Sequence, residues 1–162
     1  MAKQPIYTIR KAKLSDAGAT ANFAYALSKQ HQAYDKKLYK LARDARKRFF
    51  EYHRNCIHAP NKIMLVAESN GTLVGYAIAS IRKRPPVYTV KFNGHLDAVY
   101  IEKKWRRKGI ASAFMKELLP WYKKKGVNTI TLMVDVDNMI GMKVWDAIGY
   151  EPYLQLRKLK LR

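Results

Sequence analysis

A strand, a basic turn and a helix follow one another directly in this chain, and this succession limits the folds open to it. Residues 95–101 are mostly apolar, residues 103–108 are mostly basic, and a helical pattern begins at about Ile110. We expect that helix to run to about Lys125, with a β-branched strand after it over 129–135. Strand, helix and strand in this order form a βαβ unit, so the two strands should lie parallel with a right-handed crossover.

The basic turn is a candidate anion-binding site. A helix N-terminus leaves backbone N–H groups unpaired and carries partial positive charge, which favours a bound phosphate. Arg106, Arg107 and Lys108 add full positive charges at this point. Gly109 and Ala111 are small, so a bulky pyrophosphate can approach the main chain there. The turn therefore predicts a phosphate or pyrophosphate site.

The rest of the chain alternates between short strands and helices. Asn70-Gly71 lies between two apolar runs and predicts an antiparallel hairpin. Leucines of the tail alternate with polar residues as in a strand, and their change of parity predicts a bulge near Arg157. The expected strands are 6–10, 62–68, 72–79, 95–101, 129–135 and the tail after residue 153, and the expected helices are 15–30, 35–58, 110–125 and 138–148.

Length and composition indicate one folded domain over residues 1–162. Hydrophobic residues make up 48% of the 162 residues, which is enough for a sizeable core. No stretch reaches the roughly 20 apolar residues needed to span a bilayer, and Met1–Pro5 lacks the apolar run of a signal peptide. The single cysteine cannot form an internal disulfide. We expect a cytoplasmic protein without membrane contact.

The chain is strongly basic. It has 32 Lys and Arg against 12 Asp and Glu, a formal net charge of +20. Such a surface attracts polyanions, although a solvated exterior of this charge is an equally good interpretation. Basic residues concentrate over 36–48, opposite apolar positions such as Leu38 and Leu41 at helical spacing. An acidic or nucleic-acid partner is therefore one open alternative.

One group of metal-ligand residue types occurs at short spacing. His53, Cys56 and His58 stand close together in the sequence, but a fourth ligand and a Cys-x-x-Cys pair are both missing. We interpret the group as the C-terminal turn of a helix and expect no metal.

The element order, together with two motifs, resembles the GNAT superfamily of N-acetyltransferases. The first motif is Arg106-x-x-Gly109-x-Ala111, and the second runs from Asn138 to the pair Gly149-Tyr150. The resemblance covers nearly the whole chain. It implies an α/β (α+β) fold with a mixed, mostly antiparallel sheet of six to seven strands, about four helices, and fourth and fifth strands that splay apart.

The resemblance also implies acetyl-CoA as co-substrate and assigns residues to it. Pantetheine would lie between the splayed strands. Asn138 matches a family asparagine at the far side of that gap, where it supports the cofactor or the departing thiol. The implied contacts are the main chain of Val99, Tyr100 and Ile101, the pyrophosphate loop of Arg106, Arg107, Lys108, Gly109, Ile110, Ala111 and Ser112, and Asn138 and Trp145.

Trp145 is a departure from the family pattern. Many members have tyrosine seven residues after the asparagine, where it protonates the coenzyme thiolate, and an indole cannot act as a general acid. Solvent or another hydroxyl, with Tyr122 and Tyr150 as candidates, could supply the proton. A thiol of pKa about 8.5 also leaves tolerably well without an acid.

Two residues are candidates for the catalytic base. His95 and Asp97 lie two apart on a strand, so their side chains share one face. Alternatively, His95 caps the strand and Asp97 pairs with a nearby Arg or Lys. The resemblance thus implies acetyl transfer to a primary amine, of a small molecule or a protein, by direct attack in a ternary complex, in a monomer or homodimer. The alternative is a basic nucleic-acid-binding module on the same fold with little or no catalysis.

Overall fold

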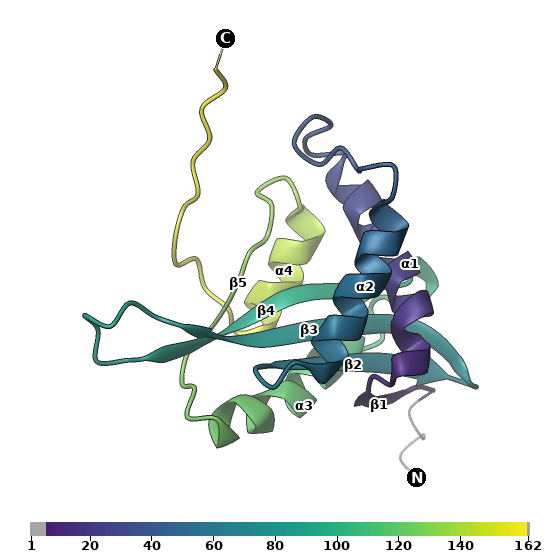
Figure 1. The fold of residues 1–162 in the computed structure, drawn as a ribbon, viewed down its shortest axis with the longest axis horizontal. Coiled ribbons are helices and arrows are strands. Elements are labelled where there is room, and N and C mark those ends of the chain that lie inside the picture. The colour runs from purple at the N-terminus through teal and green to yellow at the C-terminus, as the bar shows by residue number, and fades with distance from the viewer. Residues whose placement is uncertain (1–5, 162) are drawn as a thin grey trace.

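The computed structural model describes residues 6–161, so the segment Met1–Pro5 lies outside the described residues. Its centre is a five-stranded sheet in the order β1-β2-β3-β4-β5 (Figure 1). Neighbouring strands are antiparallel from β1 to β4, and β4 pairs with β5 in parallel. In chain order the elements are β1 (Thr8–Lys11), the short 3-10 helix η1 (Leu14–Asp16), α1 (Ala17–His31), α2 (Ala45–His58), β2 (Lys62–Ser69), β3 (Thr72–Lys83), β4 (Phe92–Ile101), η2 (Lys103–Trp105), α3 (Ile110–Lys124), β5 (Ile130–Leu132) and α4 (Met139–Ile148).

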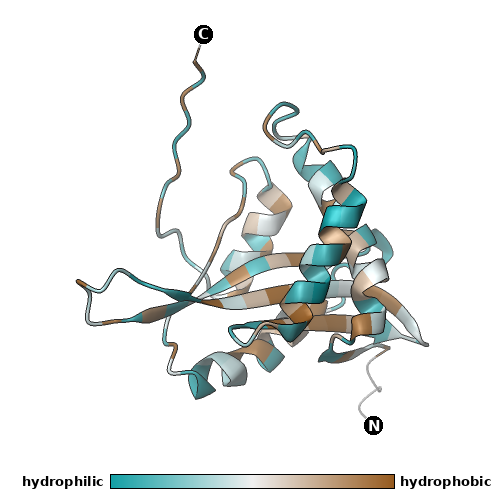
Figure 2. Cartoon of the chain, viewed as in Figure 1, coloured by the Kyte–Doolittle hydropathy of each residue, from teal (hydrophilic) through white to brown (hydrophobic). Residues whose placement is uncertain are grey.

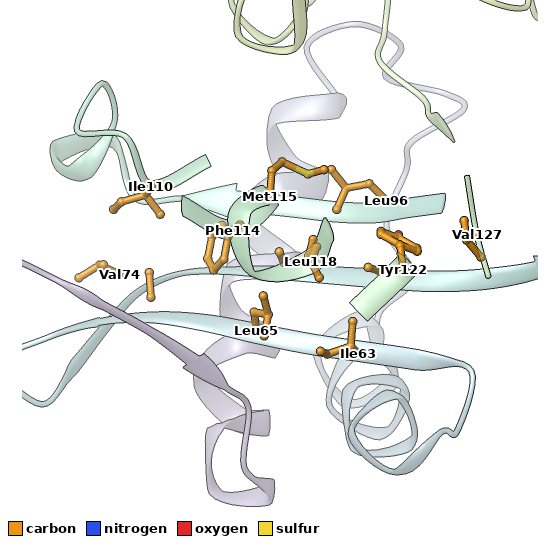
Figure 3. Close-up of a cluster of buried hydrophobic side chains, with 13 residues drawn as sticks. Ile63, Leu65, Val74, Leu96, Ile110, Phe114, Met115, Leu118, Tyr122 and Val127 are labelled. Carbon is orange, nitrogen blue, oxygen red and sulfur yellow. The ribbon is translucent and has the colours of Figure 1, made fainter. Parts of the chain in front are cut away.

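Helices cover both faces of the sheet. Helices α1 and α2 lie on one face, where Ala24 and Cys56 pack against side chains of β2 and β3. Helix α3 lies on the other face and buries Phe114 and Leu118 against the sheet (Figure 3). Apolar side chains on both faces of β2 and β3 explain why these strands are continuous hydrophobic runs, coloured brown in Figure 2.

Most of the expected elements are confirmed, but the second helix begins ten residues later than expected. Residues 35–44 form turns, and the Asp35 side chain accepts hydrogen bonds from the backbone N–H groups of Lys37 and Leu38. Such a turn competes with helix formation. Leu38 is 67% exposed, so the apolar spacing over this segment does not mark a buried face.

The predicted count of six to seven strands is wrong, because the described chain forms five. Strand β5 has three residues where seven were expected. Residues 151–161 form no strand and leave the body of the molecule as an extended tail (Figure 1).

The two strands of the βαβ unit separate soon after they meet. Only Gly94, His95 and Leu96 of β4 pair with β5. Further along, β4 keeps its partner β3 but has none on its other side among the described residues. The register of β4 with β3 shifts at one point: Ala98 lies opposite Ile78, and Leu96 lies opposite the next residue, Ala79. Asp97 is therefore the extra residue of a β-bulge. The splayed strands that the family resemblance implied are thus present.

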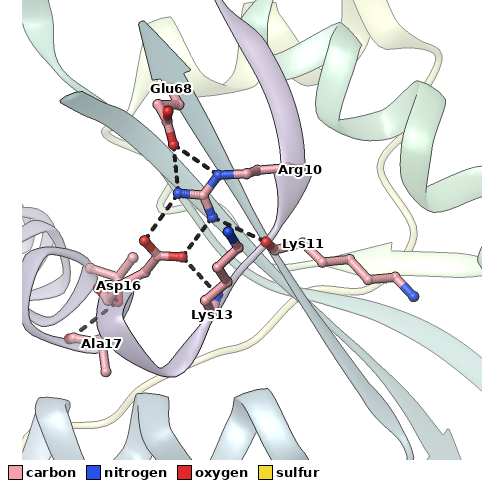
Figure 4. A network of polar contacts seen from close by, with 7 residues as sticks. Arg10, Lys11, Lys13, Asp16, Ala17 and Glu68 are labelled. Atoms are coloured by element: carbon pink, nitrogen blue, oxygen red, sulfur yellow. Dashed lines mark hydrogen bonds and ion pairs between the residues drawn. The ribbon is translucent and has the colours of Figure 1, made fainter. Parts of the chain in front are cut away.

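A polar network fixes the start of α1 to the sheet (Figure 4). Arg10 of β1 donates to Asp16 at 2.7 Å and to Glu68 of β2 at 2.8 Å. Asp16 also accepts from the backbone N–H of Lys13 at 2.7 Å. These contacts lower the pKa of Asp16, and the Arg10 guanidinium is the largest cause.

We expect Asp16→Asn to lower the free energy of unfolding by about 2 kcal/mol at pH 7, because it leaves a part-buried guanidinium without its charged partner. A carboxylate whose pKa is lowered in the folded state stabilises the fold above its unfolded pKa of about 3.9, and this stabilisation fades as the pH falls further. Denaturant titrations at several pH values should therefore show wild type and variant converging in acid. The control is Asp44→Asn, which removes an exposed pair with Arg48 and should change stability little. Equal effects of the two changes would contradict the assignment.

Candidate active site

The turn before α3 exposes a run of free backbone amides. Arg107 and Gly109 adopt left-handed conformations, with φ of 60° and 79°. No side chain in the described part of the protein caps the helix, and its first backbone hydrogen bond runs from Ala113 N–H to the carbonyl of Gly109. Among the described residues, the N–H groups of residues 107–112 have no hydrogen-bond acceptor. Six adjacent free donors at the start of a 15-residue helix form a site that fits a pyrophosphate.

The basic side chains of this turn have different roles. Arg106 donates through Nε to the carbonyl of Ile101 at 3.0 Å, so it fixes the end of β4 instead of pointing freely into the site. Lys108 lies over the Trp105 ring, with its Nζ 4.5 Å from the ring centroid. Arg107 and Lys108 give the turn its positive charge, whereas Arg106 positions the strand that leads into it.

The open edge of β4 begins beside this turn. The backbone N–H of Glu102 donates to Val74 of β3, so Tyr100, two residues earlier, also directs its main chain toward β3. By the same alternation, Val99 and Ile101 direct their N–H and C=O groups to the side where β4 has no partner. Of the three residues expected to present their main chain in the gap, Val99 and Ile101 do so. Tyr100 turns its main chain to β3, and its ring stacks on Phe23 with ring centroids 5.3 Å apart.

The two expected contacts from α4 are both engaged within the chain. Asn138 is the N-cap of α4, and its side-chain oxygen accepts from Gly141 N–H at 2.9 Å, which leaves its amide NH₂ available. Trp145 packs against the α3-side core and meets the edge of Tyr150 with centroids 5.8 Å apart.

Asp97 faces a small cavity on the α1 and α2 side of the sheet. The cavity has about 200 Å³ and is lined by Ala24, Leu27, Ser28, Phe49, Tyr52, His53, Tyr76, Ile78, Asp97 and Ala98. One Asp97 oxygen accepts from Arg82 at 2.7 Å, whereas the other, Oδ2, is buried and has no hydrogen-bond partner within residues 6–161. Buried carboxylate oxygens are rarely left unpaired, so a cationic or N–H donor in the cavity would complete this site.

His95 is close to this carboxylate but is largely enclosed. It is 5% exposed, and its Nδ1 lies 2.8 Å from Thr131 Oγ1. Burial lowers the pKa of His95 and nearby Arg82 lowers it further, while Asp97 raises it. The imidazole is therefore mostly unprotonated at neutral pH and can accept a proton.

Tyr122 and Tyr150 do not present free acidic hydroxyls. Tyr122 is 1% exposed and donates to the carbonyl of His95 at 2.7 Å. Its ring lies against Gly94, where an added Cβ would come within 2.6 Å of a ring carbon. Burial raises the pKa of Tyr150 to about 12, and its hydroxyl points to Met115 Sδ at 3.8 Å.

The His53, Cys56 and His58 group does not converge on one point. His53 is 1% exposed, and its Nδ1 lies 3.0 Å from Thr20 Oγ1. Burial lowers the pKa of His53 to about 4. Within residues 6–161, no cluster of three or more His, Cys, Asp or Glu side chains is arranged to hold a metal ion.

Sequence reasoning missed Arg82 and the lining of the cavity. Arg82 lies near the end of β3, fifteen residues from Asp97, and only the antiparallel register brings them together. Phe49 and Tyr52 of α2 are two of the residues that line the cavity. The hairpin around Asn70-Gly71 fixes only the register of β2 with β3, so it could not place Arg82 beside Asp97 of β4.

The sequence matches the profile of the Acetyltransferase (GNAT) family over residues 26–150. Among curated proteins it is 31% identical to the L-amino acid N-acetyltransferase AaaT of Escherichia coli (strain K12) over 96 residues, which are 57% of this chain and 55% of that protein. An uncharacterized N-acetyltransferase of Methanocaldococcus jannaschii is 24% identical, with 90% of this chain and 61% of that protein covered. The chain thus spans between half and two thirds of the length of these curated relatives.

Solved structures share the fold at low sequence identity. A tetramutant of the BH1408 protein from Bacillus halodurans superposes with a TM-score of 0.81 at 15% identity, covering 95% of this chain and 99% of that chain. A predicted acetyltransferase from Clostridium acetobutylicum, solved with acetyl-CoA, gives 0.73 at 22% identity, with 95% and 96% covered. Aminoglycoside 6'-N-acetyltransferase AAC(6')-Ih from Acinetobacter baumannii gives 0.75 at 16% identity, with 96% and 98% covered. Across the described residues, no helix is both long and apolar enough to cross a membrane.

Proposed function

The chain belongs to the GNAT acetyltransferase family, and from this premise we propose that it transfers an acetyl group from acetyl-CoA to a primary amine. The observation that carries the proposal is the continuity of two free hydrogen-bonding surfaces. The unpaired edge of β4 ends where the six free amides of residues 107–112 begin. A ligand with a pyrophosphate matches the free amides of residues 107–112, and an amide-containing arm attached to that pyrophosphate matches the edge of β4.

Each surface has a separate task in binding. The amides of residues 107–112 hold the pyrophosphate, with Arg107 and Lys108 adding charge. Val99 offers its N–H and C=O groups to the pantetheine amides, which would replace the missing strand partner. Ile101 offers its N–H group, because its carbonyl already accepts from Arg106. The NH₂ group of Asn138 is available to the arm from the other side of the gap. The thioester supplies an activated acetyl group that an amine can attack directly, so the enzyme needs no covalent intermediate.

The acceptor amine is proposed to enter the cavity at Asp97. Its ammonium form would satisfy the unpaired Oδ2, and the rings of Phe49, Tyr52 and Tyr76 would surround it. A cavity of about 200 Å³ is smaller than the ~300–1,000 Å³ of typical ligand pockets, so it fits only the amine-bearing end of an acceptor. Asp97 supplies local negative charge that offsets the repulsion of cations by the net charge of +20.

Attack requires the neutral amine, and His95 is the proposed proton acceptor near Asp97. A lysine-type amine of pKa about 10.4 is neutral in roughly one molecule in 2,500 at pH 7, a cost of about 4.6 kcal/mol. An α-amine of pKa about 7.8 costs only about 1 kcal/mol. The need for His95 should therefore grow with the basicity of the acceptor.

Two measurements test this function. Calorimetry with acetyl-CoA tests the cofactor site, and release of free thiol with a panel of amino acids, alkylamines and peptide N-termini tests acetyl transfer. We expect binding of acetyl-CoA without any amine, and thiol release that depends on an amine. Absence of acetyl-CoA binding would contradict the proposal, whereas binding without thiol release across the panel would contradict the catalytic part.

Trp145→Tyr is expected to leave kcat within about threefold of wild type or to raise it, because it restores a hydroxyl where many family members use one to protonate the thiolate. The change removes part of the indole packing on Tyr150, so a small loss of thermal stability accompanies it. Thiol release measured at pH 7, together with a thermal melt, checks both effects. A loss of more than about tenfold in kcat without unfolding would show that the indole itself contacts the cofactor.

Two basic side chains of the segment around α2 are engaged within the chain. Arg48 pairs with Asp44 at 2.8 Å, and the Arg46 guanidinium lies over the Tyr25 ring, with its Cζ 3.9 Å from the ring centroid. These side chains already serve contacts within the chain.

We propose a cytoplasmic location for the enzyme, where acetyl-CoA is available.

A further inference from the structure

The hairpin that joins β3 to β4 stands away from the body of the molecule. The end of β3, the connection and the start of β4 form a two-stranded ribbon over residues 82–93, which extends past the helices on the left of Figure 1. We call this ribbon the β3–β4 arm. The backbone N–H of Arg84 donates to the carbonyl of Lys91 at 2.8 Å, and that of Tyr88 donates to Pro85 at 3.2 Å. These hydrogen bonds hold the arm in one conformation.

The β3–β4 arm is strongly basic. It carries four Lys and Arg, and no Asp or Glu occurs anywhere over residues 69–96, which is the longest acid-free stretch of the sequence. Arg82, at the base of the arm, pairs with Asp97 at 2.7 Å. In the described part of the chain, Arg84 and Lys91 have no carboxylate at ion-pair distance. In a protein with a net charge of +20, two such cations attract a polyanion.

The cations of the arm share one face. Arg84 and Lys91 lie opposite each other, and the side chains of opposite residues in an antiparallel pair lie on the same face. Side chains two residues apart on a strand also share a face, so Arg82 lies on the same side as Arg84. Arg82 in turn contacts Asp97, which lines the cavity on the α1 and α2 side of the sheet. The cationic face therefore begins beside that cavity and continues along the arm.

Exposed aromatic rings accompany these cations. Tyr88 is 51% exposed, and the Cζ atom of Arg84 lies 4.6 Å from the centroid of its ring. Phe92, where β4 begins, is 46% exposed. An exposed ring offers a flat surface on which a nucleic-acid base can stack, and a neighbouring guanidinium can bind a phosphate of the same strand. Cations interleaved with exposed rings are typical of a single-stranded nucleic-acid site.

The dimensions of the arm favour nucleic acid over a protein partner. A stable protein interface buries about 800 Å² on each side and has an apolar core. Two strands that present separate cations and separate rings do not supply such a core. A single strand of nucleic acid needs none, because it binds through individual phosphate contacts and individual base stacks.

We propose that the β3–β4 arm binds single-stranded nucleic acid. Arg84 and Lys91 contact its phosphates, and a base stacks on Tyr88, whose ring the Arg84 guanidinium holds in place. The arm precedes β4, whereas the basic turn of residues 106–108 follows it, so the two basic sites lie at opposite ends of one strand. Binding at the arm does not depend on the proposed acetyl transfer.

Fluorescence anisotropy tests the proposal with the full chain and a labelled oligonucleotide of about 12 nucleotides, made as RNA and as DNA. We expect a dissociation constant on the order of 1–100 µM at physiological salt, which rises as salt is added. The single strand should bind more tightly than a duplex of the same sequence, because the bases of a duplex are not free to stack on the arm. Absence of binding to both single strands, or equally tight binding of the duplex, overturns the proposal.

Removal of charge tests the phosphate contacts. Arg84→Gln/Lys91→Gln should raise the dissociation constant by about 10-fold or more and reduce the salt slope of log K by about 1.4, since each phosphate contact of a single strand contributes about 0.7. The matched control Lys123→Gln/Lys124→Gln removes the same charge from the exposed C-terminal end of α3 and should change both quantities little. Equal weakening by the two double variants would mean that only the net charge of the protein attracts the strand, and would overturn the assignment to the arm.

Replacement of the ring tests the base stack. Tyr88→Ala should raise the dissociation constant by about 10-fold without changing the salt slope, because it removes a stacking surface and no charge. Tyr88→Phe keeps the ring and should bind as the wild type does. Tyr153→Ala is the control, since Tyr153 is 71% exposed and lies outside the arm. Wild-type affinity in Tyr88→Ala would show that no base stacks there, and would overturn the proposal.

Competition distinguishes nucleic acid from other polyanions. Polyglutamate carries negative charge but no bases, so at the same concentration of charge it should displace the labelled strand far less than the unlabelled oligonucleotide does. Equal displacement by the two polymers would identify the arm as a site for acidic polymers in general, and would contradict binding of nucleic acid as its particular role.

Discussion

Gly109→Val is expected to raise the dissociation constant of acetyl-CoA by about 100-fold or more while the protein stays folded. Gly109 has φ of 79°, a conformation that costs a β-branched residue roughly 1–2 kcal/mol or more. Space is not the obstacle, because an added Cβ would meet only the Tyr7 hydroxyl at 3.5 Å. Valine would therefore relieve its strain by rotating the backbone, which turns the amides of residues 108–110 away from a common point. Losing about two charge-assisted hydrogen bonds, each worth ~1.5–3 kcal/mol, accounts for the effect.

Gly126→Val provides a matched control for this change. Gly126 follows the other end of α3 with φ of 71°, and an added Cβ there meets nothing within 4 Å. The two substitutions therefore introduce the same kind of backbone strain and should lower thermal stability by similar amounts. Only Gly109→Val should weaken acetyl-CoA binding in calorimetry. Undiminished affinity in that variant, or equal loss in both, would rule out the pyrophosphate site at the start of α3.

The sequence predicted the elements whose local chemistry is unambiguous. Asn70-Gly71 placed the β2–β3 hairpin, and Gly109 placed the start of α3, because each glycine occupies a left-handed turn. The second helix was misplaced, since periodic leucines suggested burial where Leu38 is exposed and Asp35 forms a turn. Periodicity alone cannot tell whether an apolar residue finds a core.

The tail shows a different limit of sequence reasoning. Its alternation predicted a strand with a bulge near Arg157, and residues 151–161 form no strand in the structure. Alternation does not specify which strand edge would pair with such a segment. The prediction of additional strands assumed a partner in the same chain. The structure leaves Leu156 and its neighbours exposed, so the pattern is unsatisfied within one copy.

The candidate site was predictable where it depends on one segment and not where it depends on several. Residues 106–112 were proposed from their own sequence, and the amides of residues 107–112 have no acceptor among the described residues, but cofactor binding there stays a prediction. His95 and Asp97 were chosen from their spacing on one strand, and their roles in catalysis stay predictions. The buried, unpaired oxygen of Asp97 could not be foreseen, because it results from the bulge in β4 and from Arg82 on β3.

Asp97→Asn is expected to lower kcat/KM for a lysine-type amine by about 100-fold at pH 7 and to leave the affinity for acetyl-CoA unchanged. At this pH the acceptor is almost entirely an ammonium ion, which a carboxylate binds far better than an amide. As the pH approaches the pKa of the amine, the neutral form becomes abundant and charge pairing matters less. The deficit should therefore shrink at pH 9.5. Replacing His95 and Asp97 together with apolar residues should give a larger loss with the same pH dependence.

Arg82→Gln separates binding of the acceptor from a structural role of Asp97. This variant removes the ion pair but keeps the carboxylate, whereas Asp97→Asn keeps Arg82 and removes the negative charge. If Asp97 serves the amine, Arg82→Gln should retain most of the activity at pH 7, because the oxygen released from Arg82 remains an acceptor. If Asp97 only holds Arg82 in place, both variants should lose activity alike and at every pH. Thiol release measured from pH 7 to 9.5 for both variants decides between these roles, and a pH-independent loss in Asp97→Asn would exclude Asp97 as the group that receives the ammonium.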